Sequence, residues 1–130
     1  MAAQTIDEAD AEEITSICRT VVGDELRSVT YFTKETAKQL YLRSDLERTA
    51  DLMGFAELER MGFQSDTAYR NTQLGEYQAT VRMFENGFLT RIIEGDHGVW
   101  VTTDGMSIDR FDELVHALTP MLAELPMDEE

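Results

Sequence analysis

The chain has 130 residues, a length that fits one domain able to bury a core without disulfides or structural metals. Hydrophobic residues make up 42% of it, and no apolar run approaches the about 20 residues of a membrane-spanning helix. The acidic N-terminus lacks the basic region and apolar stretch of a signal peptide. The single cysteine, Cys18, excludes an internal disulfide and a multi-cysteine metal site. We therefore expect a cytoplasmic globular protein that does not associate with membranes.

The charge balance is strongly acidic, with 26 acidic residues against 11 basic ones and a formal net charge of −15. Lys34 and Lys38 are its two lysines. This composition resembles that of proteins from extremely halophilic archaea, which work in molar salt, where the Debye length is only about 3 Å. The acidity then predicts a solvated surface more than an acidic binding patch. Because there is no basic cluster to neutralise phosphates, we expect no nucleic-acid partner.

The first half of the chain predicts a helix, a hairpin and a second helix. Apolar residues at helical spacing predict a helix over residues 6–22. β-branched and aromatic residues predict a strand over 28–33, and residues 37–43 complete a hairpin with it. A capping-box spacing and an apolar stripe predict a second helix over residues 45–61, interrupted by Gly54.

The second half predicts three strands and a last helix. The strands are expected over 77–85, 88–94 and 99–103, with a two-residue turn at Asn86-Gly87 and a four-residue turn before the third strand. A helix follows over 108–119, with the next residue, a proline, expected to kink or break it.

The predicted order is α-β-β-α-β-β-β-α, which describes an α+β domain with a five-stranded antiparallel sheet and helices on both faces. This single domain is expected over residues 5–125, with disordered tails at 1–4 and 126–130.

The turns set a predicted register, with Val81 opposite Ile92 and Ile92 opposite Val101. One face of the sheet is then continuously apolar: Tyr77, Ala79, Val81, Met83, Ile92, Val99 and Val101. The other face mixes apolar residues with two arginines: Phe84, Leu89, Ile93, Trp100, Arg82 and Arg91. That second face is large enough to require cover, either by the second helix or by a second copy of the chain.

The order and length of these elements resemble the roadblock/dynein light-chain family, over residues 6–118; profilin-like and PAS-like domains share a central five-stranded antiparallel sheet. The segments VTYFT (29–33), QLYLRSDL (39–46) and GDHGV (95–99) resemble a family of small uncharacterised proteins from halophilic archaea. The roadblock resemblance implies a homodimer that pairs through the middle helix and the third strand and acts as a scaffold or regulator of small GTPases.

That resemblance implies a set of interface residues on those two elements. They are Tyr77, Ala79, Thr80, Val81, Arg82 and Phe84 on the strand, and Met53, Gly54 and Glu57 on the helix. The strand has no proline and no lysine, so it lacks common protections against pairing with another chain. We therefore expect a non-enzymatic dimeric interaction module without a cofactor. The alternative is a PAS-like small-molecule sensor with its ligand between sheet and helix.

Few residues are candidates for chemistry. Cys18 lies in an apolar helical stripe, which favours a buried hydrophobe over a reactive thiol. His97 and Asp96 lie in an acidic turn that could hold a cation, although such turns are usually only polar. Arg82 and Arg91, expected to be cross-strand neighbours, could anchor an anion or pair with carboxylates. Since the sequence has no catalytic motif or phosphate loop, we expect neither a catalytic residue nor a metal site.

Overall fold

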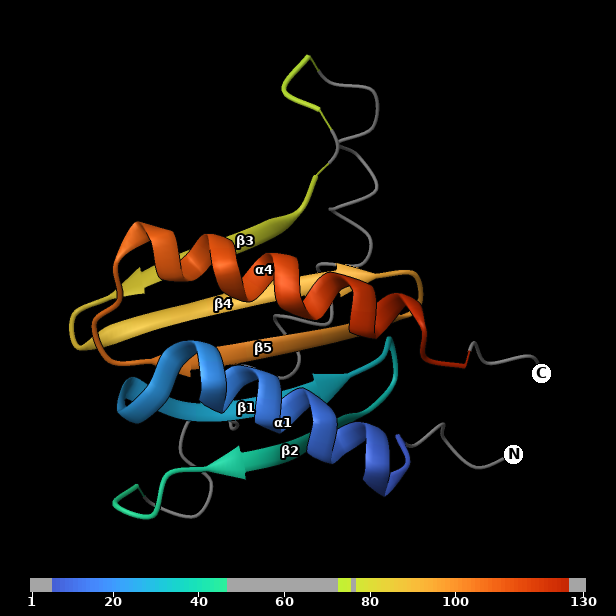
Figure 1. Ribbon diagram of the computed structural model, residues 1–130, viewed down its shortest axis with the longest axis horizontal. Helices are drawn as coiled ribbons and strands as arrows, with labels where there is room; N and C mark the ends of the chain where they lie inside the picture. The colour runs from blue at the N-terminus through green and yellow to red at the C-terminus, as the bar shows by residue number, and fades with distance from the viewer. Residues whose placement is uncertain (1–5, 47–72, 76, 127–130) are drawn as a thin grey trace.

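The computed structural model describes residues 6–46, 73–75 and 77–126. Its elements are α1 (Glu8–Val22), the 3-10 helix η1 (Gly23–Glu25), β1 (Leu26–Phe32), β2 (Ala37–Leu42), β3 (Ala79–Phe84), β4 (Gly87–Glu94), β5 (His97–Thr103) and α4 (Ile108–Ala123). The strands form one antiparallel sheet in the order β2-β1-β5-β4-β3 (Figure 1). The predicted α+β class and five-stranded antiparallel sheet are therefore confirmed.

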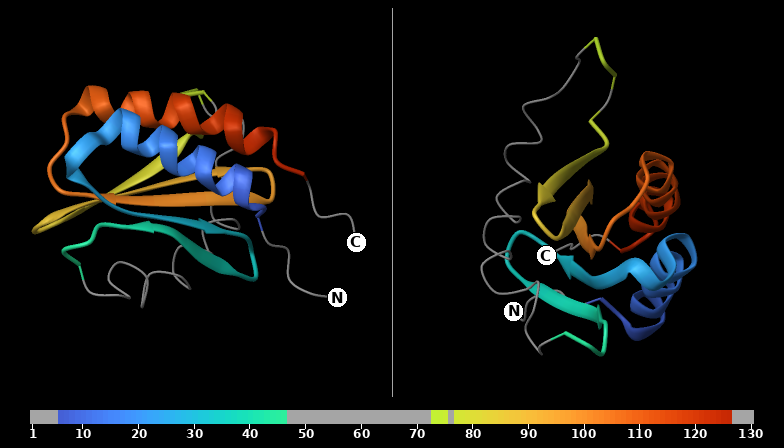
Figure 2. Two further views of the ribbon diagram at one scale, coloured as in Figure 1. Left: turned by 60° about the horizontal axis from the view of Figure 1, so that its bottom comes forward. Right: turned by 90° about the vertical axis from the view of Figure 1, so that its left-hand side faces the viewer.

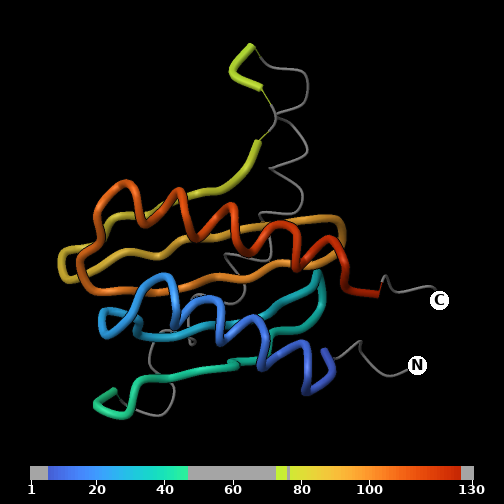
Figure 3. The backbone as a smooth tube through the Cα atoms, viewed as in Figure 1, coloured from blue at the N-terminus to red at the C-terminus, as the bar shows by residue number. Residues whose placement is uncertain are grey.

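Helices α1 and α4 lie side by side on one face of this sheet (Figure 2). The tube view shows how β1 and β5, which are far apart in the chain, run together through its centre (Figure 3). The helix predicted over residues 45–61 falls outside the described residues beyond position 46, and so do Met53, Gly54 and Glu57.

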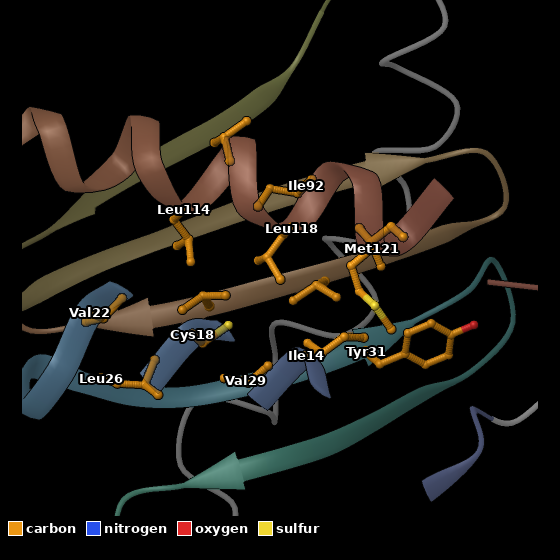
Figure 4. Close-up of a cluster of buried hydrophobic side chains, with 14 of the residues drawn as sticks. Ile14, Cys18, Val22, Leu26, Val29, Tyr31, Ile92, Leu114, Leu118 and Met121 are labelled. Atoms are coloured by element: carbon orange, nitrogen blue, oxygen red, sulfur yellow. The ribbon is translucent and has the colours of Figure 1, made fainter. Parts of the chain in front are cut away.

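The main hydrophobic core lies between these two helices and the sheet (Figure 4). Ile14, Cys18 and Val22 follow one another at intervals of four residues on α1, so all three point at the sheet. On α4, Leu114 and Leu118 share one face in the same way. They meet an apolar sheet face that includes three of the predicted residues, Ile92, Val99 and Val101, together with Val29 and Tyr31.

The ends of both helices are set by specific residues. The Asp7 side chain accepts a hydrogen bond from the Asp10 amide at 2.9 Å, so α1 begins at Glu8. Gly23 ends it with φ of 78°, a conformation that glycine adopts without the cost of a side chain. Ser107 caps α4 in the same way as Asp7 caps α1.

Both turns predicted between β3 and β5 are wrong, and each strand register is shifted by two residues from its predicted pairing. The first turn is Glu85-Asn86, so that Val81 pairs with Thr90 rather than with Ile92. The second has two residues instead of four, and Ile92 pairs with Val99. The positive φ of Gly95, 65°, suits this tight connection. Because side chains alternate between the two faces with a period of two, a shift of two residues leaves every side chain on its predicted face of the sheet.

Helix α4 continues through Pro120 to Ala123, so of the predicted kink or break, the break is wrong. A proline removes the hydrogen bond to the carbonyl of the residue four positions earlier, which here is His116. Both residues are exposed, so water can satisfy that carbonyl. Met121 and Leu122 are buried directly after the proline, and their burial favours the continued helix.

Candidate interaction surface

Strand β3 is one of the two edges of the sheet (Figure 1). Its second half is exposed and carries three large apolar side chains beside Arg82. Met83 is 79% exposed, Phe84 48% and Val81 46%. Val81 and Met83 were expected in the main core, and this expectation is wrong because α4 packs over β4 rather than over β3. An edge strand with exposed large hydrophobic side chains is the arrangement in which another chain can add to a sheet.

The opposite edge, β2, is protected in two ways. Leu40 is an extra residue in its pairing with β1, since Val29 pairs with Tyr41 and Thr30 with Gln39. Such a bulge twists an edge away from regular pairing. The charged side chain of Lys38 projects from the same strand and is exposed. By contrast, β3 pairs with β4 without a register shift and carries neither lysine nor proline. Of the two edges, β3 is the one suited to pairing.

A buried arginine ties the start of β3 to β4. Arg91 is only 3% exposed, and its Nη2 donates to the Thr80 hydroxyl at 3.0 Å and to the Tyr77 hydroxyl at 3.3 Å. The Tyr77 and Thr80 hydroxyls also contact each other. Arg91 lies opposite Thr80, and Arg82 lies opposite Leu89. The predicted cross-strand arginine pair is therefore wrong, since the two arginines are diagonal to each other. Arg91 serves to fix β3.

His97 is a buried structural residue, 1% exposed, at the start of β5. Its Nδ1 lies 2.6 Å from the Tyr31 hydroxyl, while Nε2 has no hydrogen-bond partner among the described residues. Burial and then the charge of Asp96 raise the pKa of Tyr31 to about 12. The sequence placed His97 inside a four-residue turn, whereas in the structure it follows the turn and begins β5 with its side chain buried. Within the described ranges, no group of three His, Cys, Asp or Glu residues is placed to hold a metal ion.

An arginine that the sequence analysis did not single out joins the ends of three segments. Arg43, just after β2, pairs with Asp45 and with Asp104, each at 2.7 Å. It also donates to the Asp24 carbonyl oxygen at 3.1 Å. The guanidinium lowers the pKa of Asp45 by hydrogen bonding. Asp104 lies 61 residues from Arg43, so no local pattern predicts this pair.

Cys18 is fully buried, as its place in the apolar stripe predicted. Burial raises the pKa of its thiol from 9.0 to about 12. A buried neutral thiol of this kind contributes packing and is not poised as a nucleophile.

A substitution at Cys18 tests this role through stability. Cys18→Ala should lower the free energy of unfolding at neutral pH by about 1 kcal/mol, because it deletes a buried atom. Since the raised pKa favours the neutral thiol in the folded state, wild-type stability should fall as pH rises from 9.0 toward about 12. Urea unfolding across this range should show a smaller alkaline loss for the variant, with the Tyr31 contribution remaining. An equal loss in both proteins would contradict a buried neutral thiol.

No helix in the described part of the chain is long and apolar enough to cross a membrane.

Comparisons with known proteins support the fold. The chain resembles the gliding protein MglB from Thermus thermophilus, with a TM-score of 0.65 and 14% identity over 94% of this chain and 96% of that one. A structure described as MglB with a tetrameric arrangement gives 0.64 and 15% identity, covering 94% and 95% of the two chains. A roadblock/LC7 domain from Streptomyces avermitilis gives 0.54 and 17% identity, covering 82% and 95%. These likenesses establish a roadblock-type fold and confirm the predicted resemblance.

No curated protein matches the chain. A family model does match, over residues 12–123, and its description is a domain of unknown function, DUF7522. Because this match spans most of the 130 residues, the chain belongs to the DUF7522 family.

Proposed function

We propose that this protein is a non-enzymatic interaction module that forms a homodimer through the edge of β3 and acts in the cytoplasm as a scaffold or regulator. The observation that carries the proposal is the contrast between the two sheet edges. β2 has a bulge and an exposed lysine, whereas β3 pairs without a register shift and exposes three apolar side chains, with Met83 79% exposed. A regular edge that exposes apolar side chains and lacks lysine and proline favours pairing with an identical strand.

Two copies of β3 can pair antiparallel about a two-fold axis and extend the sheet across both protomers. The side chains of Val81 and Met83 share the face that carries α4, so the axis would bring the two pairs side by side. Phe84 would do the same on the opposite face. A self-complementary contact of this kind should bury on the order of 1,200 Å² or more. The structure described as tetrameric MglB shows that a protein of this fold can self-associate.

Light scattering in molar potassium chloride tests the interface with two matched lysine substitutions. Met83→Lys places a charge on the β3 edge, and Ile108→Lys places one on α4 at a similarly exposed residue, 83% against 79%. We expect a dimeric wild type, a monomeric or strongly weakened Met83→Lys, and a dimeric Ile108→Lys, because charge opposes edge pairing.

A monomeric wild type would refute the dimer. If Met83→Lys is as dimeric as Ile108→Lys, the interface does not include the β3 edge. Circular dichroism on all three proteins separates loss of pairing from loss of fold.

We propose a small GTPase as the regulated partner, on the strength of the roadblock-type fold alone. Calorimetry with a small GTPase from the same source, loaded with GDP or with a non-hydrolysable GTP analogue, tests this partner. The proposal predicts that affinity differs between the two nucleotide states. If no small GTPase of that source binds in either nucleotide state, the proposed GTPase partner is wrong. The proposed dimer is not tested by that result.

A further inference from the structure

An exposed apolar surface lies beside α4 on the sheet face that carries the two helices. Its members are Ile108 and Phe111 on α4, Phe88 on β4, and Val81 and Met83 on β3, and together they form the α4–β3 shelf. Ile108 is 83% exposed, Met83 79% and Val81 46%, while the two phenylalanines are partly buried. Large apolar side chains that gather in one exposed place on a soluble protein mark a surface to which another chain binds.

Principles of strand and helix geometry place these residues next to one another. Met83 pairs directly with Phe88, and the Phe88 ring packs edge-to-face on Phe111, with ring centroids 5.3 Å apart. Ile108 lies one turn before Phe111 on the same side of α4. Val81, two positions before Met83, continues the shelf along the same face of β3.

The side of α4 that carries Ile108 points away from α1 and toward β3. Arg110, on the opposite side of the helix, donates to the Val22 carbonyl oxygen of α1 at 3.0 Å. It is the single arginine of α4, which contains no lysine. Arg82 of β3 lies on the other face of the sheet, beside Leu89. The basic residues of α4 and β3 therefore do not border the shelf.

The rim of the shelf is acidic. Asp112 follows Ile108 by four residues on the same side of α4, and its side chain is 70% exposed. Its Oδ1 lies 3.2 Å from His116 Nδ1, and a carboxylate has room for further donors on its two oxygens. Glu85, directly after β3, is exposed at the end of the shelf where Met83 lies. An apolar strip bordered by carboxylates is complementary to an apolar surface with basic residues along its edge.

The two helices of the structure show which kind of element covers this sheet face. α1 lies over β1 and β2, and α4 lies over β4. A further helix beside α4, at the usual interaxial distance of about 8–10 Å, would lie about two strand spacings of 4.8 Å from β4. It would cover β3, with Val81 and Met83 beneath it and Ile108 at its side. Pairing of the β3 edge uses backbone groups in the plane of the sheet, so it does not occupy this position.

We propose that the α4–β3 shelf binds an amphipathic helix of a partner protein, with apolar side chains against Ile108, Met83 and Val81 and lysine or arginine beside Asp112. This inference rests on the proposed role as an interaction module, because it names the kind of surface that such a module recognises. It requires neither the GTPase nor the dimer, since each protomer carries its own shelf.

Three synthetic peptides of about 18 residues test the chemistry of the partner. The first forms a helix with leucine on one face and lysine on the other, the second has the same residues in scrambled order, and the third has glutamate in place of lysine. Each carries fluorescein at nanomolar concentration, and the full chain is titrated into it in molar potassium chloride while anisotropy is followed. We expect saturable binding of the first peptide.

Binding of the other two peptides should be weaker by about tenfold or more. The scrambled peptide lacks a continuous apolar face, and the glutamate peptide brings like charges to the rim of the shelf.

Two lysine substitutions on α4 locate the site. Ile108→Lys places a charge on the shelf and should weaken binding of the leucine–lysine peptide by about tenfold or more. Glu113→Lys, at an exposed position three residues after Arg110 and away from the shelf, should leave the affinity within about twofold of the wild type. Because Glu113→Lys makes the larger change in net charge, a general electrostatic effect would weaken its binding more than that of Ile108→Lys.

The assignment is overturned if the leucine–lysine peptide shows no saturable binding, if either of the other peptides binds equally well, or if the two variants weaken binding equally. The peptide comparison uses only the wild type, so it is decisive even if Ile108→Lys fails to fold.

Light scattering on the same samples separates this inference from the proposed dimer. A monomeric wild type that binds the leucine–lysine peptide would refute the dimer and support the shelf. A wild-type species larger than a dimer, reduced to a dimer by Ile108→Lys, would show that a second copy of the chain covers the shelf and would overturn the partner helix.

Discussion

Transfer from multimolar to about 0.1 M potassium chloride should lower the thermal midpoint by about 10–20 °C, through the loss of a few kcal/mol of stability. The cause is the formal net charge of −15, which repels itself when ions no longer screen it. Arg43 pairs with Asp45 and Asp104, but the chain's 11 basic residues are too few to neutralise its 26 acidic ones. Calorimetry or circular dichroism melts across a salt series measure the effect.

A triple variant controls for the origin of this salt dependence. Glu8, Glu12 and Glu13 are exposed on the outer face of α1, and changing all three to glutamine removes three negative charges. The variant should show a flatter dependence of midpoint on salt than the wild type. A wild-type thermal midpoint that does not change with salt would contradict the halophilic interpretation. The acidic residues would then again be candidates for a binding surface.

Gly98→Ala should destabilise the protein by about 1–3 kcal/mol or more, as overpacking does in a close-packed interior. A Cβ at Gly98 would lie less than 3.0 Å from three ring carbons of Phe32. That ring is fully buried against Trp100, with centroids 5.2 Å apart, so it has little room to move away. Chemical denaturation of the variant measures the loss.

Gly105→Ala is the matched control, since a Cβ at Gly105 would meet no atom within 4 Å. It should unfold within about 0.5 kcal/mol of the wild type, as exposed substitutions usually do. If the two alanine variants prove equally stable, the contact of Gly98 with Phe32 does not constrain the core.

The sequence was sufficient to predict the elements in the described part of the chain and the faces of the sheet, because periodicity reports them directly. The stripe of Ile14, Cys18 and Val22 predicted the buried face of α1, and the alternation in β4 and β5 predicted the core residues Ile92, Val99 and Val101. The failed registers show the limit of this reasoning. The Asn-Gly dipeptide favours a turn at its own position, but here Gly87 belongs to β4, where close approach of the Thr103 carbonyl requires glycine.

The surface properties of β3 needed the structure. Val81 and Met83 alternate with polar residues, which is the pattern of a strand with one buried face. They are exposed because α4 packs over β4, and the sequence gives no sign of that position. Likewise, the sequence placed His97 in an acidic turn, whereas the residue begins β5 and its partner Tyr31 lies 66 residues away. Contacts between distant segments leave no local signal in a sequence.

The central position of β1 beside β5 has a consequence for how the chain folds. The other three strand pairs join neighbours in the chain, so β1 with β2 and β3 with β4 and β5 can form as local hairpins. The seam between the two groups links Ser28 to Thr102, 74 residues apart. Closing a flexible loop of that length costs about 4 kcal/mol of chain entropy by the (3/2)RT ln n rule. The barrier to folding should therefore lie at the β1–β5 seam, and side chains along it should govern the refolding rate more than those in either hairpin.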